Sequence, residues 1–182
     1  MVDCHIDIQI EQAPSCYLVQ TDMIAKLMAH MLQSLSLEAW ELSLSFVSDI
    51  EMQKINAQHR NRNQSTDVLS FPQQMWKTPL HFGEKNVHSK KEEVDSFYSK
   101  PLGDIIISLE RAEQNAQEID HGLDREICFL LIHGLLHLCG HDHERPEEEA
   151  IMCEQQQKIL LELQGKDPVP WLNMVTRKKD SP

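Results

Sequence analysis

Hydrophobic residues alternate with polar residues in two segments of the chain, a pattern typical of β-strands. In residues 5–10 isoleucine occupies every second position, and residues 40–47 repeat the alternation with leucine and phenylalanine. Two further segments rich in β-branched residues, 66–71 and 102–109, also predict strands, and Pro72 ends the first of them. The pattern therefore predicts about four strands.

Other segments carry apolar residues three or four positions apart, which is the spacing of an amphipathic helix. Residues 21–35 form the first, with Thr21 or Asp22 as its cap, and Ser48 opens a second through a capping box with Glu51. Three more helices are predicted in a row at residues 110–120, 124–139 and 146–164. Strands and helices are mixed without strict alternation, so we predict an α+β domain with a mixed sheet covered by helices.

The length of 182 residues corresponds to one domain, which we place at residues 1–172. Residues 73–100 show no periodicity and mix both signs of charge, and so long a stretch inside a domain predicts a mobile insertion. Residues 173–182 are predicted to form a frayed tail.

Charge and cysteine content narrow the class of function. Seventeen basic and 29 acidic residues give a net charge of −12, which argues against a nucleic-acid coat protein, a DNA-binding protein or a polybasic membrane binder. No apolar run is long enough to span a bilayer, and the first residues lack the basic region of a secretory signal. The five cysteines are an odd number without framework spacing, so we expect reduced thiols and a cytoplasmic protein without membrane partners.

Four of the ten histidines lie within eleven residues, and three of them have the spacing of metal ligands. His133 and His137 are four residues apart on a predicted helix, so their imidazoles share one face. Gly140 can end that helix and turn the chain so that His143 returns to the same face. Neutral imidazoles suit zinc, copper, nickel and iron(II), of which zinc is the commonest, and three protein ligands leave a fourth position open. We predict one zinc ion per chain, held by a helix near the C-terminal half. His141 lies within the turn, and we expect it to support the site or to face solvent.

The histidine spacing matches the H-E-x-x-H-x-x-G-x-x-H pattern of metzincin peptidases at every position but one. Gly134 stands where those enzymes carry their general-base glutamate. A zinc peptidase or amidase therefore remains an alternative, although its acid–base group is missing.

Three separated motifs resemble the YbeY endoribonuclease family. The first is His133-Gly-Leu-Leu-His137-Leu-Cys-Gly-His-Asp-His143, with histidine at position 141 where the family usually has tyrosine. The others are Asn56 and Arg60 followed by T-D-V-L-S-F-P at residues 66–72, and L-G-D-I-I-I-S at residues 102–108. The resemblance covers roughly residues 40–150. It implies a small α+β fold and a zinc-dependent endoribonuclease specific for single-stranded RNA.

That resemblance also implies a role in ribosomal RNA maturation, including small-subunit rRNA, and in ribosome quality control, with the ribosome or its proteins as partners. The family's zinc ligands fall on His133, His137 and His143, and its functionally important arginine falls on Arg60. We assign catalysis to Arg60 and His133. Arg60 can clamp a phosphate through two parallel hydrogen bonds, and either water or the 2′-hydroxyl of the RNA can act as nucleophile.

Substrate contacts are assigned to Arg60, Arg62 and Ser70, with the two arginines forming a positive wall near the zinc. Asp142 and Glu144 are expected to be a turn cap and a solvated acid. Two other acids, Asp67 and Asp104, either position the histidines or satisfy loop backbone, and Thr66 is expected to be a turn residue. A third alternative is a ribosome-associated assembly factor without enzymatic activity, in which the metal only stabilises the fold.

Overall fold

Helices and strands follow one another largely in the order that the hydrophobic pattern predicts. The computed structural model describes residues 5–84, 100–165 and 173–178. In chain order its elements are β1 (His5–Gln9), β2 (Tyr17–Val19), α1 (Thr21–Ser34), β3 (Trp40–Val47), α2 (Asp49–Arg60), β4 (Val68–Pro72), β5 (Lys100–Ser108), α3 (Leu109–Glu118), α4 (Leu123–Leu138), α5 (Pro146–Gln164) and β6 (Val175–Arg177). Within these ranges no helix combines the length and the apolar character needed to cross a bilayer.

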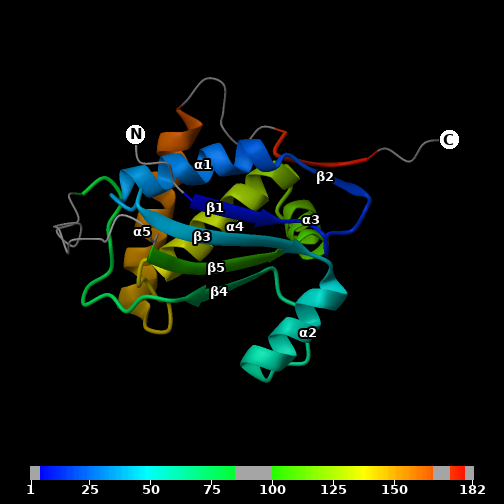
Figure 1. Cartoon of the computed structure of the whole chain (residues 1–182), viewed down its shortest axis with the longest axis horizontal. Helices are drawn as coiled ribbons and strands as arrows, with labels where there is room; N and C mark the ends of the chain where they lie inside the picture. The colour runs from blue at the N-terminus through cyan, green and yellow to red at the C-terminus, as the bar shows by residue number, and fades with distance from the viewer. Residues whose placement is uncertain (1–4, 85–99, 166–172, 179–182) are drawn as a thin grey trace.

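The main sheet contains four strands in the order β1-β3-β5-β4 (Figure 1). β1, β3 and β5 run parallel, and β4 pairs with β5 in the antiparallel direction as an edge strand. The prediction of an α+β fold with a four-stranded mixed sheet is confirmed. Pro72, which lacks an amide hydrogen, ends β4 at this edge, where a missing donor costs least.

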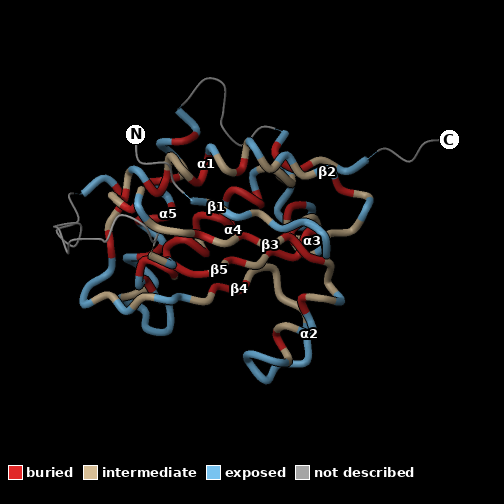
Figure 2. Tube along the Cα trace, in the orientation of Figure 1, coloured by how far each residue is buried: buried red, intermediate tan, exposed pale blue. Residues whose placement is uncertain are grey.

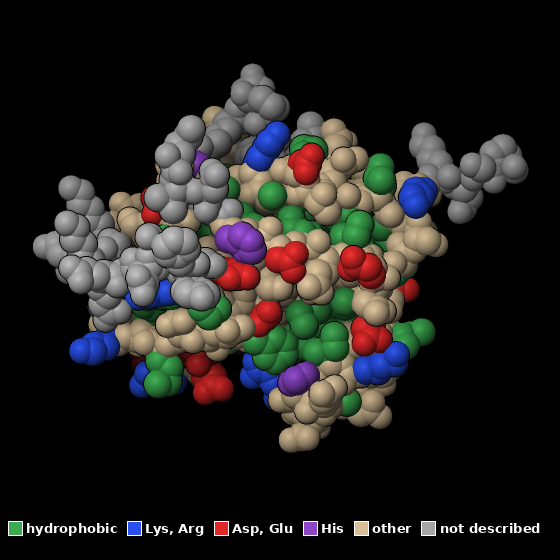
Figure 3. All heavy atoms as spheres, in the orientation of Figure 1, with side chains coloured by type: hydrophobic (Ala, Val, Ile, Leu, Met, Phe, Trp, Pro, Cys, Tyr) green, Lys and Arg blue, Asp and Glu red, His purple; other side chains and the backbone are tan. Residues whose placement is uncertain are grey.

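One face of the sheet carries most of the helices. Alternate residues of β3 and β5, such as Leu44 and Ile105, join a core shared with α1, α3, α4 and α5 (Figure 2). α2 covers part of the other face, where Met52 packs with Val47 and Leu69. No other helix of the described residues covers that face, and acidic side chains lie over it (Figure 3).

The predicted cap of α1 is wrong, and so is the predicted fraying for residues 173–178 of the tail, whereas residues 179–182 lie outside the described residues. Thr21 already lies inside α1, and Gln20 occupies the cap position without a side-chain hydrogen bond. β6 is part of the tail, and it pairs with β2, a strand that the sequence pattern does not indicate. The carboxylate of Asp124 accepts hydrogen bonds from the backbone amides of Asn173 and Val175, which fixes residues 173–177 against α4.

The first part of the predicted mobile insertion is packed into the core. Leu80 and Phe82 are 2% and 1% exposed, and the Phe82 amide donates to the buried Gln155 side chain at 3.0 Å. The prediction of mobility is therefore wrong for residues 73–84. Residues 85–99 of the predicted insertion lie outside the described residues.

α4 approaches β5 closely because Gly134 has no side chain. A Cβ atom at position 134 would lie 2.8 Å from Cγ2 of Ile105, which is closer than carbon atoms pack. Ile105 is buried and β-branched, so it has little freedom to move aside. This contact sets the depth at which α4, with its two histidines, lies on the sheet.

We predict that Gly134→Ala lowers the free energy of unfolding by about 1 kcal/mol, the net of a mid-range overpacking cost of about 2 kcal/mol and the gain in helix propensity. Overpacking against Ile105 costs about 1–3 kcal/mol, which exceeds the gain of about 1 kcal/mol in helix propensity. Denaturant unfolding measures the change. Gly165→Ala is the control, because a Cβ built at this exposed residue makes only ordinary contacts of 3.5 Å or more, at a φ that alanine adopts freely. Equal stability of Gly134→Ala and the wild type would contradict this account of the α4–β5 packing.

Candidate metal centre

Three histidines converge at the C-terminal end of α4. His133 and His137 lie one turn apart, and their Nε2 atoms are 3.1 Å from each other. Gly140, with a φ of +88°, turns the chain after the helix, and the amide of His141 donates back to the Leu136 carbonyl. This turn returns His143 to the pair, so that one nitrogen from each ring lies within 4.8 Å of the others. The three side chains can therefore share one metal ion.

Hydrogen bonds behind the rings fix which nitrogen faces the site. Nδ1 of His137 lies 3.1 Å from the His141 carbonyl and must donate to it, which leaves the Nε2 lone pair for a metal. His133 is hydrogen-bonded by the side chain of Gln156. This hydrogen bond raises the pKa of His133, so the ring donates and Oε1 of Gln156 accepts, while Nε2 of Gln156 donates to the Phe129 carbonyl at 3.2 Å.

Burial keeps the rings of His133 and His137 neutral. It lowers the pKa of His137 to about 4, and the neighbouring rings of His133 and His143 act in the same direction. Burial also lowers the pKa of His133, against the opposing effects of the Gln156 hydrogen bond and the charge of Asp67. Neutral imidazole is the form that binds metal, so both rings are in their ligand form at neutral pH.

A segment from the predicted insertion supports the turn that carries His143. We call residues 76–82 the strap. Nε1 of Trp76 donates to the Leu138 carbonyl at 2.7 Å, and the amide of Leu80 donates to the Cys139 carbonyl at 3.0 Å. The strap thus satisfies two carbonyls at the end of α4 that have no partner within the helix.

The strap also holds His141. The buried His141 ring places Nε2 2.9 Å from the Leu80 carbonyl, while its own carbonyl accepts from His137. His141 therefore supports a ligand, as one of the two predicted alternatives states, and the solvent-facing alternative is wrong.

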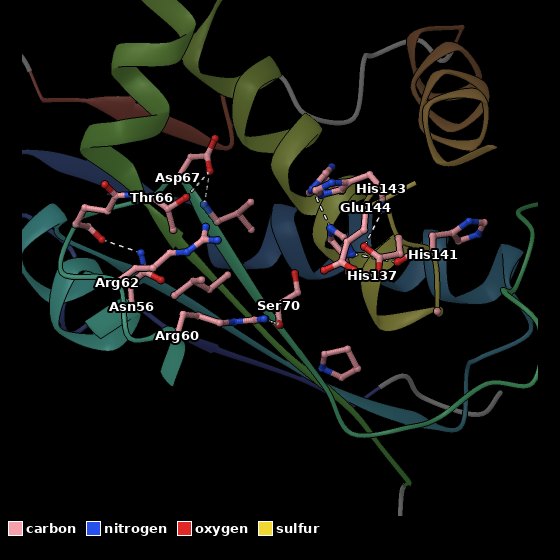
Figure 4. Close-up of a pocket in the computed structure, with 17 residues that line it drawn as sticks. Asn56, Arg60, Arg62, Thr66, Asp67, Ser70, His137, His141, His143 and Glu144 are labelled. Carbon is pink, nitrogen blue, oxygen red and sulfur yellow. Dashed lines mark hydrogen bonds between the residues drawn. The ribbon is translucent and has the colours of Figure 1, made fainter. Parts of the chain in front are cut away.

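The arginines assigned to substrate contacts lie across a pocket from the histidines. The pocket has a volume of about 850 Å³ and is lined by both groups. Arg60 and Arg62 enter from the α2 side, the histidines come from the α4 side, and Ser70 lies between them (Figure 4). The buried side chain of Asn56 donates to the Gln64 carbonyl at 2.7 Å and holds the loop that follows α2. The first residues after α2 are thereby fixed beside the pocket.

Arg60 and Ser70 are joined through the backbone of β4. Nη2 of Arg60 donates to the Ser70 carbonyl at 3.1 Å, and its guanidinium carbon lies 5.6 Å from the centre of the Phe71 ring. Ser70 is 8% exposed, and its buried hydroxyl has no hydrogen-bond partner among the described residues. A buried hydroxyl without a partner is costly, so its position in the pocket suits a ligand that it can hydrogen-bond.

Three acidic residues, Asp67, Asp142 and Asp104, accept hydrogen bonds from nearby groups, and none of these bonds comes from a histidine ring. The carboxylate of Asp67 accepts from the Val68 amide, the Thr66 hydroxyl and Asn115, so it satisfies its own loop and α3. Asp142 accepts from the amide of His143, as predicted for a turn cap. Further away, Asp104 accepts from Gln73 at 3.0 Å.

Comparisons with known proteins agree with this geometry. The family model described as Endoribonuclease YbeY matches residues 8–164. The chain belongs to the YbeY family. The endoribonuclease YbeY of Lysinibacillus sphaericus is 41% identical over 143 residues, which cover 77% of this chain and 83% of that protein. That of Limosilactobacillus reuteri is 38% identical over 142 residues, covering 78% and 86%.

A solved structure supports the YbeY fold assignment. The solution structure of TM1509 from Thermotoga maritima aligns with a TM-score of 0.54 at 26% identity. The alignment covers 86% of this chain and 87% of that one. The fold of this YbeY family member is therefore found in a protein solved by experiment.

Sequence reasoning missed the residues that support the ligands. Gln156 and the strap are distant from the histidine motif along the chain. The sequence does carry one sign of Gln156: this polar residue is spaced so that it shares the inward face of α5 with the apolar Met152 and Ile159. A buried amide of this kind needs a partner, and that partner is His133.

We predict that Gln156→Leu raises the dissociation constant for zinc about 10- to 100-fold, because it removes the group that orients His133. Gln157→Leu makes the same change at an exposed position of α5 and serves as the control. Competition against a chromophoric chelator measures the affinity, and circular dichroism checks that the variants fold. Equal zinc affinity of the folded Gln156→Leu protein and its control would show that the hydrogen bond does not orient a metal ligand.

Proposed function

We propose that this protein is a zinc-dependent endoribonuclease that cleaves single-stranded ribosomal RNA. The observation that carries the proposal is the pocket in which three histidines face two arginines. Membership of the YbeY family supports the same activity. An enzyme that cleaves a phosphodiester must stabilise negative charge on the phosphate from more than one side, and the two walls of the pocket can do so.

Each side chain of the pocket has a role in this proposal. His133, His137 and His143 hold the metal, which supplies Lewis-acid stabilisation of the scissile phosphate when it is bound. Arg60 contacts the same phosphate from the opposite wall, and its carbonyl partner on Ser70 fixes the guanidinium in place. Arg62 contacts a neighbouring phosphate, and the Ser70 hydroxyl donates to a phosphate oxygen. We assign catalysis to Arg60 and His133.

The distribution of charge fits a local phosphate site in an acidic protein. Asp7 of β1 and Asp104 of β5 both pair with Ser43 of β3, which lies between them. The two acids therefore lie in one row across the face of the sheet that most helices do not cover. Arg60 and Arg62 lie in the pocket. Asp142 and Glu144 border the histidines, so the positive wall is confined to the α2 side. We infer that the ribosome or a ribosomal protein supplies the remaining affinity for rRNA, in the cytoplasm.

A peptidase activity is disfavoured by the position of Gly134. The metzincin base would have to occupy this residue, but position 134 faces β5 and has no space even for a methyl group. A glutamate there would lie inside the core and not beside the histidines. The metzincin-like spacing of the histidines is therefore not sufficient evidence to propose a peptidase activity.

The endoribonuclease proposal predicts that Arg60→Ala reduces cleavage of a single-stranded RNA about 100-fold or more, because one of its charge-stabilising groups is lost. Lys54→Ala, which removes an exposed cation from the same helix, should cleave like the wild type. Gel assays with labelled single-stranded and duplex RNA measure both rate and strand preference. Equal cleavage by the wild type, Arg60→Ala and His133→Ala would mean that the activity comes from a contaminant.

Removal of the metal distinguishes two hypotheses: an enzyme that needs the metal for cleavage, and an assembly factor in which the metal only stabilises the fold. The core of α4 packs without contribution from the exposed His143, so we predict that chelated protein keeps its helical circular dichroism and loses cleavage. Elemental analysis should find about one zinc per chain in the wild type, and none in His137→Ala. Unfolding on chelation would instead favour the assembly factor.

A further inference from the structure

The face of α4 that carries the ligands continues beyond the metal centre. Arg125, Phe129, His133 and His137 are spaced by four residues, so each lies one turn from the next on the helix surface. Phe129 is 39% exposed, whereas the other apolar side chains of α4 from Ile127 onward are at most 3% exposed. An apolar helix that buries its other large side chains thus leaves one aromatic ring in water, beside the site.

The ring of Phe129 is held next to a metal ligand in a defined orientation. Its plane is inclined by only 20° to the imidazole of His133, and the ring centroids are 6.5 Å apart. The Phe129 carbonyl accepts from Gln156, the same side chain that orients His133. One residue of α5 therefore contacts both the backbone of Phe129 and the ring of His133, and the near-parallel rings of Phe129 and His133 give a group stacked on Phe129 a position close to the metal site.

Arg125 adds a positive charge at the next turn. Its side chain is exposed and has no hydrogen-bond or ion-pair partner in the described part of the chain. Both neighbouring acids point elsewhere: Asp124 accepts from backbone amides near β6, and Glu126 is buried with His121 and Asn115. Arg125 is therefore available to an anion even though the chain as a whole carries −12.

We infer that Phe129 stacks on an unpaired nucleobase next to the scissile phosphate and that Arg125 contacts a phosphate further along the same strand. This inference rests on the proposed function. Aromatic faces interleaved with cations are how proteins track single-stranded nucleic acid. A base inside a duplex is stacked on its neighbours and cannot lie on this ring, so Phe129 also provides a physical basis for single-strand preference.

The test of Phe129 compares RNA binding and cleavage by three variants at this position. We expect Phe129→Ala to raise KM and the dissociation constant for a single-stranded oligoribonucleotide about 5- to 100-fold, the range measured for base–aromatic stacking, with little change in kcat. Phe129→Trp should bind at least as tightly as the wild type, and Phe129→Leu should resemble alanine. Leu161→Ala, which truncates a 66% exposed leucine on α5, is the control.

An oligonucleotide with abasic sites separates stacking from general apolar contact. Abasic sites should weaken RNA binding by the wild type. They should not weaken binding by Phe129→Ala any further, because that variant has already lost the ring on which a base would stack. Wild-type affinity in Phe129→Leu, or equal sensitivity of both proteins to abasic sites, would overturn the inference and indicate a patch for a protein partner. Polarisation binding does not require cleavage, so these outcomes are distinct from a failure of the proposed enzymatic activity.

The salt dependence of binding tests Arg125. Each phosphate contact with a single strand contributes about 0.7 to the slope of log affinity against log salt. Arg125→Ala should reduce the slope by about that amount, while Arg125→Lys should leave it unchanged. An unchanged slope in the folded Arg125→Ala protein would exclude the phosphate contact.

Discussion

The close contact between α4 and β5 at Gly134 determines the geometry of the site. Because position 134 lacks a side chain, the helix lies against Ile105 and brings His137 to the sheet edge where β4 carries Ser70. Ile105, which lies under α4, pairs in the sheet with Ser70, which lines the pocket, so the two residues are direct neighbours. The same contact removes the position that a peptidase would need for its base. One packing constraint thus places the ligands and limits the chemistry.

The parts of the fold that depend on local pattern were predictable. β3 and α5 have their predicted bounds, and Ser48 caps α2 through the Glu51 amide as its capping box indicates. The convergence of His133, His137 and His143 also follows from local spacing, since a helical turn and a glycine turn bring them together. The facing wall does not follow from spacing, because Arg60 lies at the end of α2 and reaches the pocket through its contact with β4, so only the family resemblance identifies it.

Contacts between distant segments were not predictable from periodicity. The strap carries no regular pattern, yet Trp76 and Leu80 bind the end of α4 through backbone carbonyls that any sequence possesses. β2 and β6 contain three residues each, too few for a period to be recognised, and the tail is held by Asp124 of α4. The sequence pattern predicts mobility for the strap and the tail, and misses β2, because the partners that fix these segments lie far away in the chain.

The central claim is that metal and Arg60 act on one phosphate from opposite walls of the pocket. Crystals grown with zinc and a single-stranded oligonucleotide in which methylene groups replace both bridging oxygens of the scissile phosphate, so that neither water nor a 2′-hydroxyl can cleave it, test this directly by anomalous diffraction. The account predicts one zinc peak about 2.0–2.1 Å from a nitrogen of each of the three histidines, and a phosphate between that peak and the Arg60 guanidinium. A zinc peak bound elsewhere, or a phosphate at the metal without contact to Arg60, would contradict it.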